Sequence, residues 1–287
     1  MAASVEHVLR VALTASVERF LAHEAGVQTG GDAEDVHQTR VACRRLRSDL
    51  RTFDAFVDPE WAESLRTELG WLGAELGAVR DHEVLLERLR AEIDRLPDSE
   101  RDTAARVVQR LVTNWETTRA AMLAALATPR YHALRAAMQD AATTPKCTEA
   151  ASAPARKALP LVVKRPWRKL AAGVAALGDD PADEQLHEIR IRAKRARYAA
   201  EAVAPLFGGQ ARKFAAAMAQ VQEVLGEHQD AVVARQWLAE TAVEVSAVEA
   251  YSIGMLGAVE WEAARAARRE FPGVWKQASR PGLRAWL

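Results

Sequence analysis

Apolar residues recur along the chain at intervals of three and four, which is the spacing of one face of an α-helix. No sustained alternation of β-branched and polar residues indicates strands. Prolines, glycines and the N-cap candidates Asp32, Asp58, Ser99 and Asp180 interrupt the helical spacing. The pattern therefore predicts an all-α protein, with helices near 4–28, 32–57, 60–95, 99–127, 130–142, 166–177, 181–204, 210–226, 229–247 and 249–270.

Three segments of the first half recur in the second half in the same order. The matched pairs are 36–47 with 186–197, 76–84 with 225–233, and 115–121 with 261–267. Their offsets of 150, 149 and 146 positions differ little, which is typical of an internal duplication. We therefore predict two tandem-duplicated helical bundles, related by pseudo-two-fold symmetry around a central groove.

A segment without helical periodicity separates the two copies. Residues 143–160, TTPKCTEAASAPARKALP, are rich in Pro, Ala, Thr and Ser, a composition typical of a linker. We therefore predict a first helical repeat over 1–142, the linker over 143–160 and a second repeat over 161–270. The C-terminal tail, 271–287, contains two tryptophans and is expected to have little order of its own, with docking on the body of the protein or on a partner as open alternatives.

One predicted helix of each repeat carries a stripe of basic residues. Its members fall within an arc of about 80° when each residue is rotated by about 100°. They are His37, Arg40, Arg44, Arg47 and Arg51 in the first copy and His187, Arg190, Lys194 and Arg197 in the second. Glu201 occupies the position that corresponds to Arg51.

Apolar residues border both stripes, whereas a solvated charged face is not usually bordered in this way. The bordering residues are Cys43, Leu46, Leu50 and Phe53 with Val41 opposite, and Ile189, Ala196, Ala200 and Val203 with Ile191 opposite. Like charges at helical spacing repel by about 0.2–0.5 kcal/mol per pair. The stripes are therefore predicted to line a groove that binds an anion.

The overall composition hides this concentration of charge. The 39 Lys and Arg residues balance 39 Asp and Glu residues, which excludes a generally basic protein. Five basic residues against one acid give span 37–51 a net charge of +4, and five against two give span 187–201 a charge of +3. Twelve acids against six arginines give span 60–102 a charge of −6. Lys164 with Arg168, and Arg212 with Lys213, add basic pairs near the second stripe.

The motif H-x-x-R-x-x-x-[RK]-R-x-R occurs in both copies, and L-G-x-x-x-D follows each of them. The second copy continues as R-Y-x-x-E through Arg197, Tyr198 and Glu201. Over about residues 5–270 this combination resembles the CHAD domain, the conserved histidine α-helical domain. The CYTH signature E-x-E-x-K, which often accompanies that domain, is absent, so the resemblance is to a stand-alone CHAD protein.

This resemblance implies a basic groove that binds inorganic polyphosphate, and association with polyphosphate granules and other granule proteins. Gln229 stands where the first half has Arg80, so any role of that arginine is confined to one half. By position, the resemblance makes His37, Arg40, Arg44, Arg47, His187, Arg190, Lys194 and Arg197 face the ligand. The charge pattern adds Arg51, Lys164, Arg168, Arg212 and Lys213 as candidate polyphosphate-binding residues.

Several alternatives remain beside this interpretation. The stripes could form structural ion pairs with acids such as Asp81 and Asp230, or could bind nucleic acid or another polyanion. Nucleic acid is the less favoured ligand because Tyr198 is the one aromatic residue near a stripe apart from the apolar border residue Phe53, and the eight tryptophans have the spacing of core residues. A role as accessory protein to a phosphohydrolase is a further alternative.

Catalytic and metal-binding signatures are absent from the sequence. No phosphate-binding glycine loop or Ser/His/Asp arrangement is present, and arginines beside His37 and His187 would repel a metal cation. We therefore expect a non-enzymatic protein with no metal and no cofactor, and a buried, unreactive Cys43. Two cysteines, charged residues within the N-terminal helix and no long apolar run favour a cytoplasmic protein with no membrane partner.

Overall fold

A computed structural model describes residues 3–29 and 33–287, and it confirms the all-α prediction. The described residues form no β-strand, and isolated bridges join Ser4 to Pro154 and Val57 to Cys147. Of the predicted N-caps, Asp58 accepts a hydrogen bond from the backbone N–H of Trp61 at 2.8 Å. Ser99 and Asp180 are not N-caps, because α4 begins after Pro97 and α9 begins after Ala182. Asp32 lies outside the described residues.

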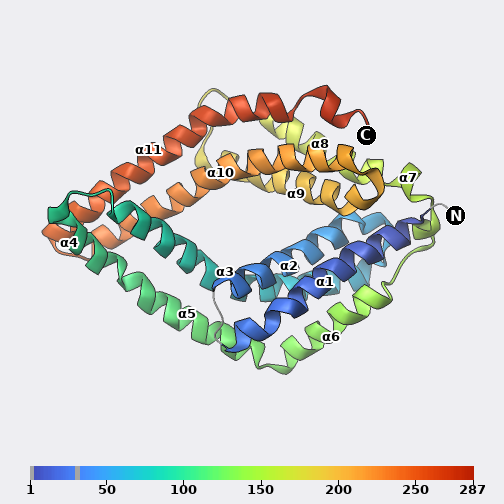
Figure 1. Cartoon of the computed structure of the whole chain (residues 1–287), viewed down its shortest axis with the longest axis horizontal. Helices are drawn as coiled ribbons and strands as arrows, with labels where there is room; N and C mark the ends of the chain where they lie inside the picture. The colour runs from blue at the N-terminus through green and yellow to red at the C-terminus, as the bar shows by residue number, and fades with distance from the viewer. Residues whose placement is uncertain (1–2, 30–32) are drawn as a thin grey trace.

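The first repeat surrounds its stripe helix, α2, with other helices. α2 packs between α1 and α3, while α6 covers α1 and α5 packs on α3 (Figure 1). The predicted single helix over 99–127 is wrong, because the chain forms two helices that meet at Gln109. The elements are α1 (Val5–Thr29), α2 (Ala33–Thr52), η1 (Asp54–Phe56), α3 (Pro59–Ile93), α4 (Asp98–Val108), α5 (Arg110–Leu126) and α6 (Pro129–Thr143).

The second repeat follows η2 (Glu149–Ser152) and the short helix α7 (Ala155–Ala158). Its stripe helix, α9, packs between α8 and α10, and α10 forms a long hairpin with α11. The elements are α8 (Pro160–Ala175), α9 (Asp183–Phe207), α10 (Gly209–Ala242), α11 (Ala247–Ala278) and η3 (Pro281–Arg284).

Three helix boundaries in the second repeat differ from the prediction. α9 continues past Pro205 to Phe207, and the chain turns at Gly208, whose φ of 65° lies in the left-handed region that favours glycine. α10 is one continuous helix where a break near residues 227–228 was predicted, because Leu225 and His228 are buried in its middle. The helix predicted from 166 begins at Pro160, with Pro166 inside it.

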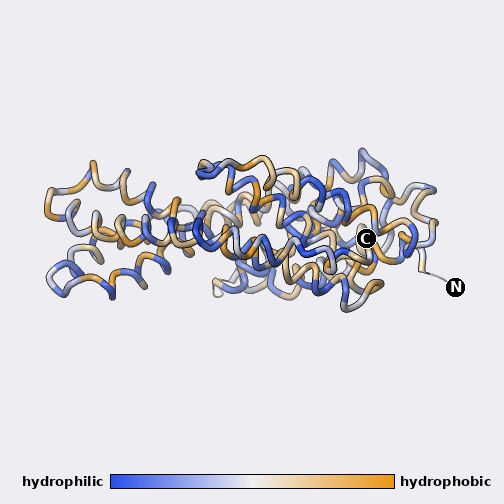
Figure 2. Tube along the Cα trace, turned by 90° about the horizontal axis from the view of Figure 1, so that it is seen from above, coloured by the Kyte–Doolittle hydropathy of each residue, from blue (hydrophilic) through white to orange (hydrophobic). Residues whose placement is uncertain are grey.

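Buried residues of both repeats share one hydrophobic core. This main core runs from Leu9, Leu46 and Leu72 in the first repeat to Ala196 and Phe214 in the second. A second cluster, including Leu89, Val107, Leu238 and Leu256, joins α3, α4 and α5 to the α10–α11 hairpin, where these helices meet in Figure 1. Hydrophobic and hydrophilic residues are interspersed along the helices (Figure 2), as expected for helices that bury one face and expose the other.

The segment 271–287 is more ordered than predicted, and of the two docking alternatives it takes the body of the protein. α11 continues to Ala278, and Trp275 stacks on Trp167 of α8 with ring centroids 5.4 Å apart. Trp286 packs against Phe207 and Phe214. These aromatic contacts hold the segment against α8, α9 and α10.

Candidate functional site

The two stripe helices, α2 and α9, contact each other at the boundary between the repeats. One apolar border of each stripe is buried: Cys43, Leu46 and Leu50 of α2 and Phe53 just after it are fully buried, and Ile189, Ala196, Ala200 and Val203 are buried on α9. The residues of the opposite borders, Val41 and Ile191, are half-buried. Burial anchors one face of each helix in the main core. The basic residues are consequently directed along the boundary where the helices meet.

Lys194 occupies the centre of the basic cluster. It is half-buried on α9, and its pKa is lowered to about 7 by burial and by the positive charges of Arg44, Arg190, Arg40 and Arg197, in that order. Four of the stripe arginines, from both repeats, therefore act on one ammonium group. We call these five side chains the basic cluster.

Corresponding arginines of the two repeats make corresponding contacts with the helices that follow them. The guanidinium of Arg40 lies against Gly77 of α3, where a Cβ would be 3.5 Å from its Nε, and Arg190 lies at the same distance from Gly226 of α10. Arg40 Nη1 also forms an ion pair with Asp81 at 3.0 Å. The glycine of each L-G-x-x-x-D motif thus marks where a stripe arginine rests on the neighbouring helix.

The aspartates of the two L-G-x-x-x-D motifs, Asp81 and Asp230, differ in their contacts with the stripe arginines. Burial raises the pKa of Asp230, and the nearby Arg190 and Arg88 oppose the rise. Arg190 nevertheless forms no ion pair within 4.0 Å among the described residues, and its buried Nε has no hydrogen-bond partner there. The structural ion pair considered from the sequence therefore exists for Arg40 and not for Arg190.

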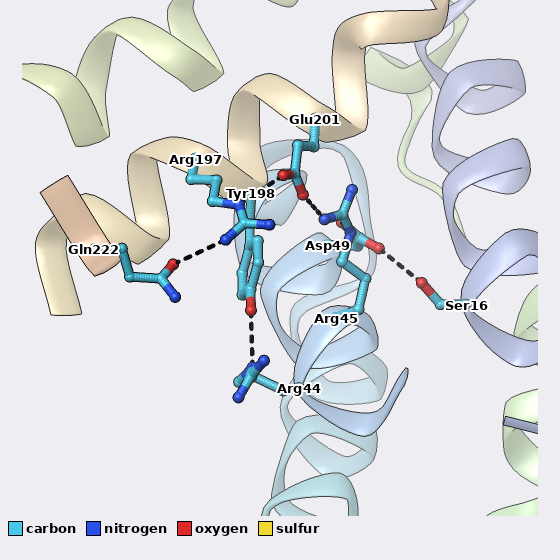
Figure 3. Close-up of polar contacts among 8 residues, drawn as sticks. All are labelled: Ser16, Arg44, Arg45, Asp49, Arg197, Tyr198, Glu201 and Gln222. Atoms are coloured by element: carbon cyan, nitrogen blue, oxygen red, sulfur yellow. Dashed lines mark hydrogen bonds and ion pairs between the residues drawn. The ribbon is translucent and has the colours of Figure 1, made fainter. Parts of the chain in front are cut away.

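A polar network joins the repeats beside the basic cluster (Figure 3). Arg44 Nε donates a hydrogen bond of 2.8 Å to the hydroxyl oxygen of Tyr198. Glu201 accepts from Arg197 Nε at 2.7 Å and also binds Arg45 of α2. The guanidinium groups of Arg44, Arg45 and Arg197 surround the Tyr198 ring, with Cζ atoms 5.8, 5.2 and 5.9 Å from its centroid.

Asp49 is the buried acid of this network. Ser16 Oγ donates to Asp49 Oδ2 at 3.4 Å, and Arg45 Nε lies 4.0 Å from Oδ1. Burial raises the pKa of Asp49 to about 7, and the Arg45 charge and the Ser16 hydrogen bond oppose that rise. The carboxyl group can therefore change its charge near neutral pH.

A cavity of about 660 Å³ opens beside the network. Its volume lies within the usual range of ligand pockets. The predicted residues His37, Arg44 and Arg197 line it together with Arg45 and Arg19, which the sequence analysis did not select. Arg45 lies outside the stripe arc, although its equivalence to Arg195 at an offset of 150 was a usable signal.

The two stripe histidines are half-buried. Burial, followed by the charge of Arg80, lowers the pKa of His37, which favours the neutral imidazole. Nδ1 of His187 is buried without a hydrogen-bond partner among the described residues. Within the same part of the chain, no group of three or more His, Cys, Asp or Glu side chains could hold a metal ion.

The remaining predicted site residues are not part of the basic cluster. Arg47 and Arg51 are exposed on α2, and Arg51 has Arg195, Arg47 and Arg66 as positive neighbours. Lys164 and Arg168 lie on α8, and Arg212 and Lys213 are exposed near the start of α10. None of these four is among the charges that act on Lys194.

The structure resolves two side-chain expectations. Cys43 is fully buried, and burial raises its thiol pKa to about 12, so it is unreactive as expected. The expectation that the repeated tryptophans belong to the core is wrong for Trp261, which is 46% exposed beneath the guanidinium of Arg265. Trp115 is half-buried, and its Nε1 donates to Glu83 at 3.3 Å.

The structure defines an all-α protein whose two repeats bring basic helices together. Comparison of the chain with known families matches residues 11–239 to the CHAD domain. The chain belongs to the CHAD domain family.

Known proteins resemble the chain in sequence and in fold. The uncharacterized proteins MT2285 and Rv2226, from two strains of Mycobacterium tuberculosis, are each 31% identical over 93% of the chain. The match covers 52% of their length, so the chain spans about half of these curated relatives.

No helix in the described part of the chain is long and apolar enough to cross a membrane.

Two solved structures share the fold. PptA from Streptomyces chartreusis superposes with a TM-score of 0.81 at 25% identity, covering 95% of this chain and 99% of PptA. The CHAD domain from the plant Ricinus communis gives a TM-score of 0.75 at 28% identity, covering 99% and 93% of the two chains. Both likenesses extend over nearly the whole chain.

Proposed function

We propose that the chain binds inorganic polyphosphate in a basic groove between α2 and α9. The observation that carries the proposal is the basic cluster around Lys194. Of its five cations, Arg40 has Asp81 and Arg197 has Glu201 as carboxylate partners. Arg44, Arg190 and Lys194 form no ion pair among the described residues, so an anionic ligand would relieve their repulsion.

The arrangement of these cations favours a long, uniform anion. They come from two repeated helices, and arginine presents a planar fork that can bind phosphate through two hydrogen bonds. The CHAD family to which the chain belongs is associated with polyphosphate binding. The groove-lining set that we propose includes the histidines and basic residues predicted from both stripes, and Arg45 in addition.

The repeat relationship also supports a pseudo-two-fold arrangement of the groove. The contact of Arg40 with Gly77 is equivalent to the contact of Arg190 with Gly226. The two arginines are 150 positions apart in the chain and the two glycines are 149 positions apart. A two-sided groove suits a polymer that presents the same group at every step. We further propose that binding of this kind underlies association of the protein with cytoplasmic polyphosphate granules and their proteins.

Nucleic acid is the second candidate ligand, because any phosphate backbone would be attracted to the cluster. Tyr198 is 5% exposed, and its ring is surrounded by three guanidinium groups. It therefore offers no free face on which a base could stack. Polyphosphate should displace RNA or DNA at equal phosphate concentration, and failure to do so would favour nucleic acid.

A filter-binding assay with long-chain polyphosphate tests the proposal. Changing Arg40, Arg44, Arg190 and Lys194 together to Glu should abolish binding, and wild-type affinity should fall linearly with the logarithm of salt concentration, by analogy with nucleic-acid binding. The matched control reverses Arg10, Arg90, Arg110 and Lys276, which are exposed on α1, α3, α5 and α11. Retained binding by the first variant and lost binding by the control would overturn the assignment.

Thermal unfolding of a variant with a neutralised cluster separates the proposal from the structural alternative. If the cluster served as ion-pair partners, neutralising Arg44, Arg190 and Lys194 with Gln would lower the melting temperature. If it awaits a ligand, the same change should leave the melting temperature unchanged or raise it, because repulsion is removed. We also propose a non-enzymatic role, which release of orthophosphate from polyphosphate with Mg²⁺ would contradict.

A further inference from the structure

The two repeats differ at one position in otherwise equivalent triads. Arg45, Arg197 and Glu201 correspond, at an offset of 150, to Arg195, Arg47 and Arg51. The first triad thus contains a carboxylate where the second contains a guanidinium. We call them the acidic-capped end and the arginine end of the contact between α2 and α9.

The acidic-capped end is partly neutralised. Glu201 binds Arg45 and also accepts from Arg197 at 2.7 Å, so this triad of two arginines and one carboxylate has a net charge of +1. Asp49, 4.0 Å from Arg45, lowers the positive charge further when it is ionised. Arg197 also approaches Gln222 at 3.5 Å (Figure 3). Both guanidinium groups at this end are therefore held by protein acceptors.

The arginine end has no such partner. Arg47, Arg51 and Arg195 form no ion pair with any carboxylate in the described part of the chain, and the nearby Arg66 is paired with Glu63. Burial and the positive charges of Arg195, Arg47 and Arg66 lower the pKa of Arg51. The guanidinium of Arg47 rests against Gly70 of α3, with Cζ 3.4 Å from the position that a Cβ would take.

The two ends are displaced from each other along the helices. Arg45 and Arg51 are six residues apart on α2, which is about 9 Å at 1.5 Å per residue. Lys194 and Arg44, the central pair of the basic cluster, are next to Arg195 and Arg45 in the chain. A phosphate chain in the proposed groove would therefore meet a net charge of +1 at one end and +3 at the other.

We infer that Arg47, Arg51 and Arg195 form a subsite for the terminal phosphate of a linear polyphosphate. This inference rests on the proposed function. An internal phosphate of the polymer carries a single negative charge, whereas a terminal phosphate has a second ionisation near pH 6 and carries about −1.5 to −2 at pH 7. The more highly charged group is favoured where three unpaired guanidiniums meet, and Glu201 disfavours it at the opposite end.

The test compares two polyphosphates of equal length, one with free ends and one with both ends blocked as phosphoramidates of an uncharged amine. Blocking removes the second ionisation and leaves each terminal phosphate with the single negative charge of an internal one. Wild-type protein should bind the free-ended chain about fivefold or more tightly. Arg51→Glu, which reproduces the charge pattern of the acidic-capped end, should bring the ratio of affinities close to one. Arg90→Glu, an exposed change on α3, should keep the wild-type ratio.

The outcomes distinguish this inference from the proposed function. Equal, tight binding of both polymers by the wild type overturns the terminal subsite and leaves the groove intact. If Arg51→Glu keeps the wild-type ratio of affinities for the free-ended and blocked polymers, the assignment of the subsite to Arg47, Arg51 and Arg195 is overturned. Arg51→Gln gives the same comparison if the charge reversal impairs folding. Failure of the wild type to bind either polymer overturns both proposals.

Discussion

Arg44 of the first repeat donates a hydrogen bond of 2.8 Å to the hydroxyl oxygen of Tyr198 in the second repeat. The two residues are 154 positions apart in the chain, and Tyr198 is buried. The hydroxyl group leaves the arginine charge unneutralised while fixing the direction of its Nε–H. Arg44 is thereby held in place without an acidic partner, so its positive charge still contributes to the potential of the groove.

Tyr198→Phe should therefore weaken polyphosphate binding without unfolding the protein. Loss of one hydrogen bond of about 0.5–1.5 kcal/mol corresponds to an affinity about 2- to 12-fold lower, because Arg44 must then be ordered by the ligand. Filter binding gives the affinity and thermal unfolding gives the stability. Tyr251→Phe, an exposed change on α11, is the control; equal affinities of all three proteins would show that the hydrogen bond does not position Arg44.

Binding should be accompanied by proton uptake at Lys194. Burial and its four arginine neighbours lower the pKa of this lysine to about 7, so much of it is neutral at pH 8 in the free protein. A polyanion stabilises the charged form and raises the pKa, so affinity should decrease as the pH rises above 7. Titration calorimetry at pH 8 in buffers of different ionisation enthalpy should detect up to one proton taken up.

Lys194→Met supplies the control for this linkage. The variant retains most of the side-chain volume and cannot titrate. The part of the binding enthalpy that depends on the buffer should therefore decrease by the amount that proton uptake at Lys194 contributes in the wild type. An identical dependence on buffer in wild type and variant would mean that Lys194 does not contact the ligand. Arg90→Glu, distant from the cluster on α3, should keep the wild-type proton uptake.

The pH dependence of stability should contain a contribution from Asp49. Burial raises its folded-state pKa to about 7, above the usual value of 3.8. The folded protein then binds the proton more tightly than the unfolded chain, so stability present below about pH 4 is lost as the pH rises through about 7. At about 1.36 kcal/mol per pH unit, Asp49→Asn should be more stable than wild type at pH 8 by up to about 4 kcal/mol.

Denaturant unfolding at pH 4 and pH 8 measures this contribution. The variant and the wild type should differ little at pH 4 and most at pH 8. Asp54→Asn, an exposed change in η1, should follow the wild type at both values. A stability difference that is the same at pH 4 and pH 8 would mean that Asp49 does not titrate in this range.

Arg88 of α3 should be important for the attachment of the two repeats. It pairs with Glu227 at 2.6 Å and with the fully buried Glu260, also at 2.6 Å, on α10 and α11. Arg88→Ala leaves the Glu260 charge buried without its partner, so we expect a loss of about 3–5 kcal/mol in the free energy of unfolding. Adding Glu260→Gln should restore part of this loss, and additive effects of the two changes would contradict the pairing.

Local sequence patterns predicted the stripe helices well because the duplication displays each stripe twice. The His, Arg and Lys positions and the buried flanks of α2 and α9 follow directly from helical spacing. The ends of helices were predicted less well. Pro166, Pro205 and Pro272 lie inside helices, where packing of neighbours such as Trp167 and Phe271 offsets the lost backbone hydrogen bond.

Features that depend on contacts between distant segments could not be predicted from local periodicity. The order of the C-terminal segment comes from Trp275 on Trp167 and from Trp286 on Phe207, none of which are neighbours in sequence. Likewise, the separation of roles between Arg45 and Arg44 depends on Glu201 and Tyr198 from the other repeat. The sequence alone indicated where basic residues are concentrated, and the structure indicates which of these residues lack an acidic partner in the described part of the chain.

The most direct measurement of the central claim is a crystal structure of the protein with polyphosphate bound. We predict a phosphate chain between α2 and α9, with oxygens within hydrogen-bond distance of Arg44, Arg190 and Lys194. Phosphate density confined to other surfaces, such as the exposed Arg212 and Lys213, with the basic cluster unchanged, would contradict the account.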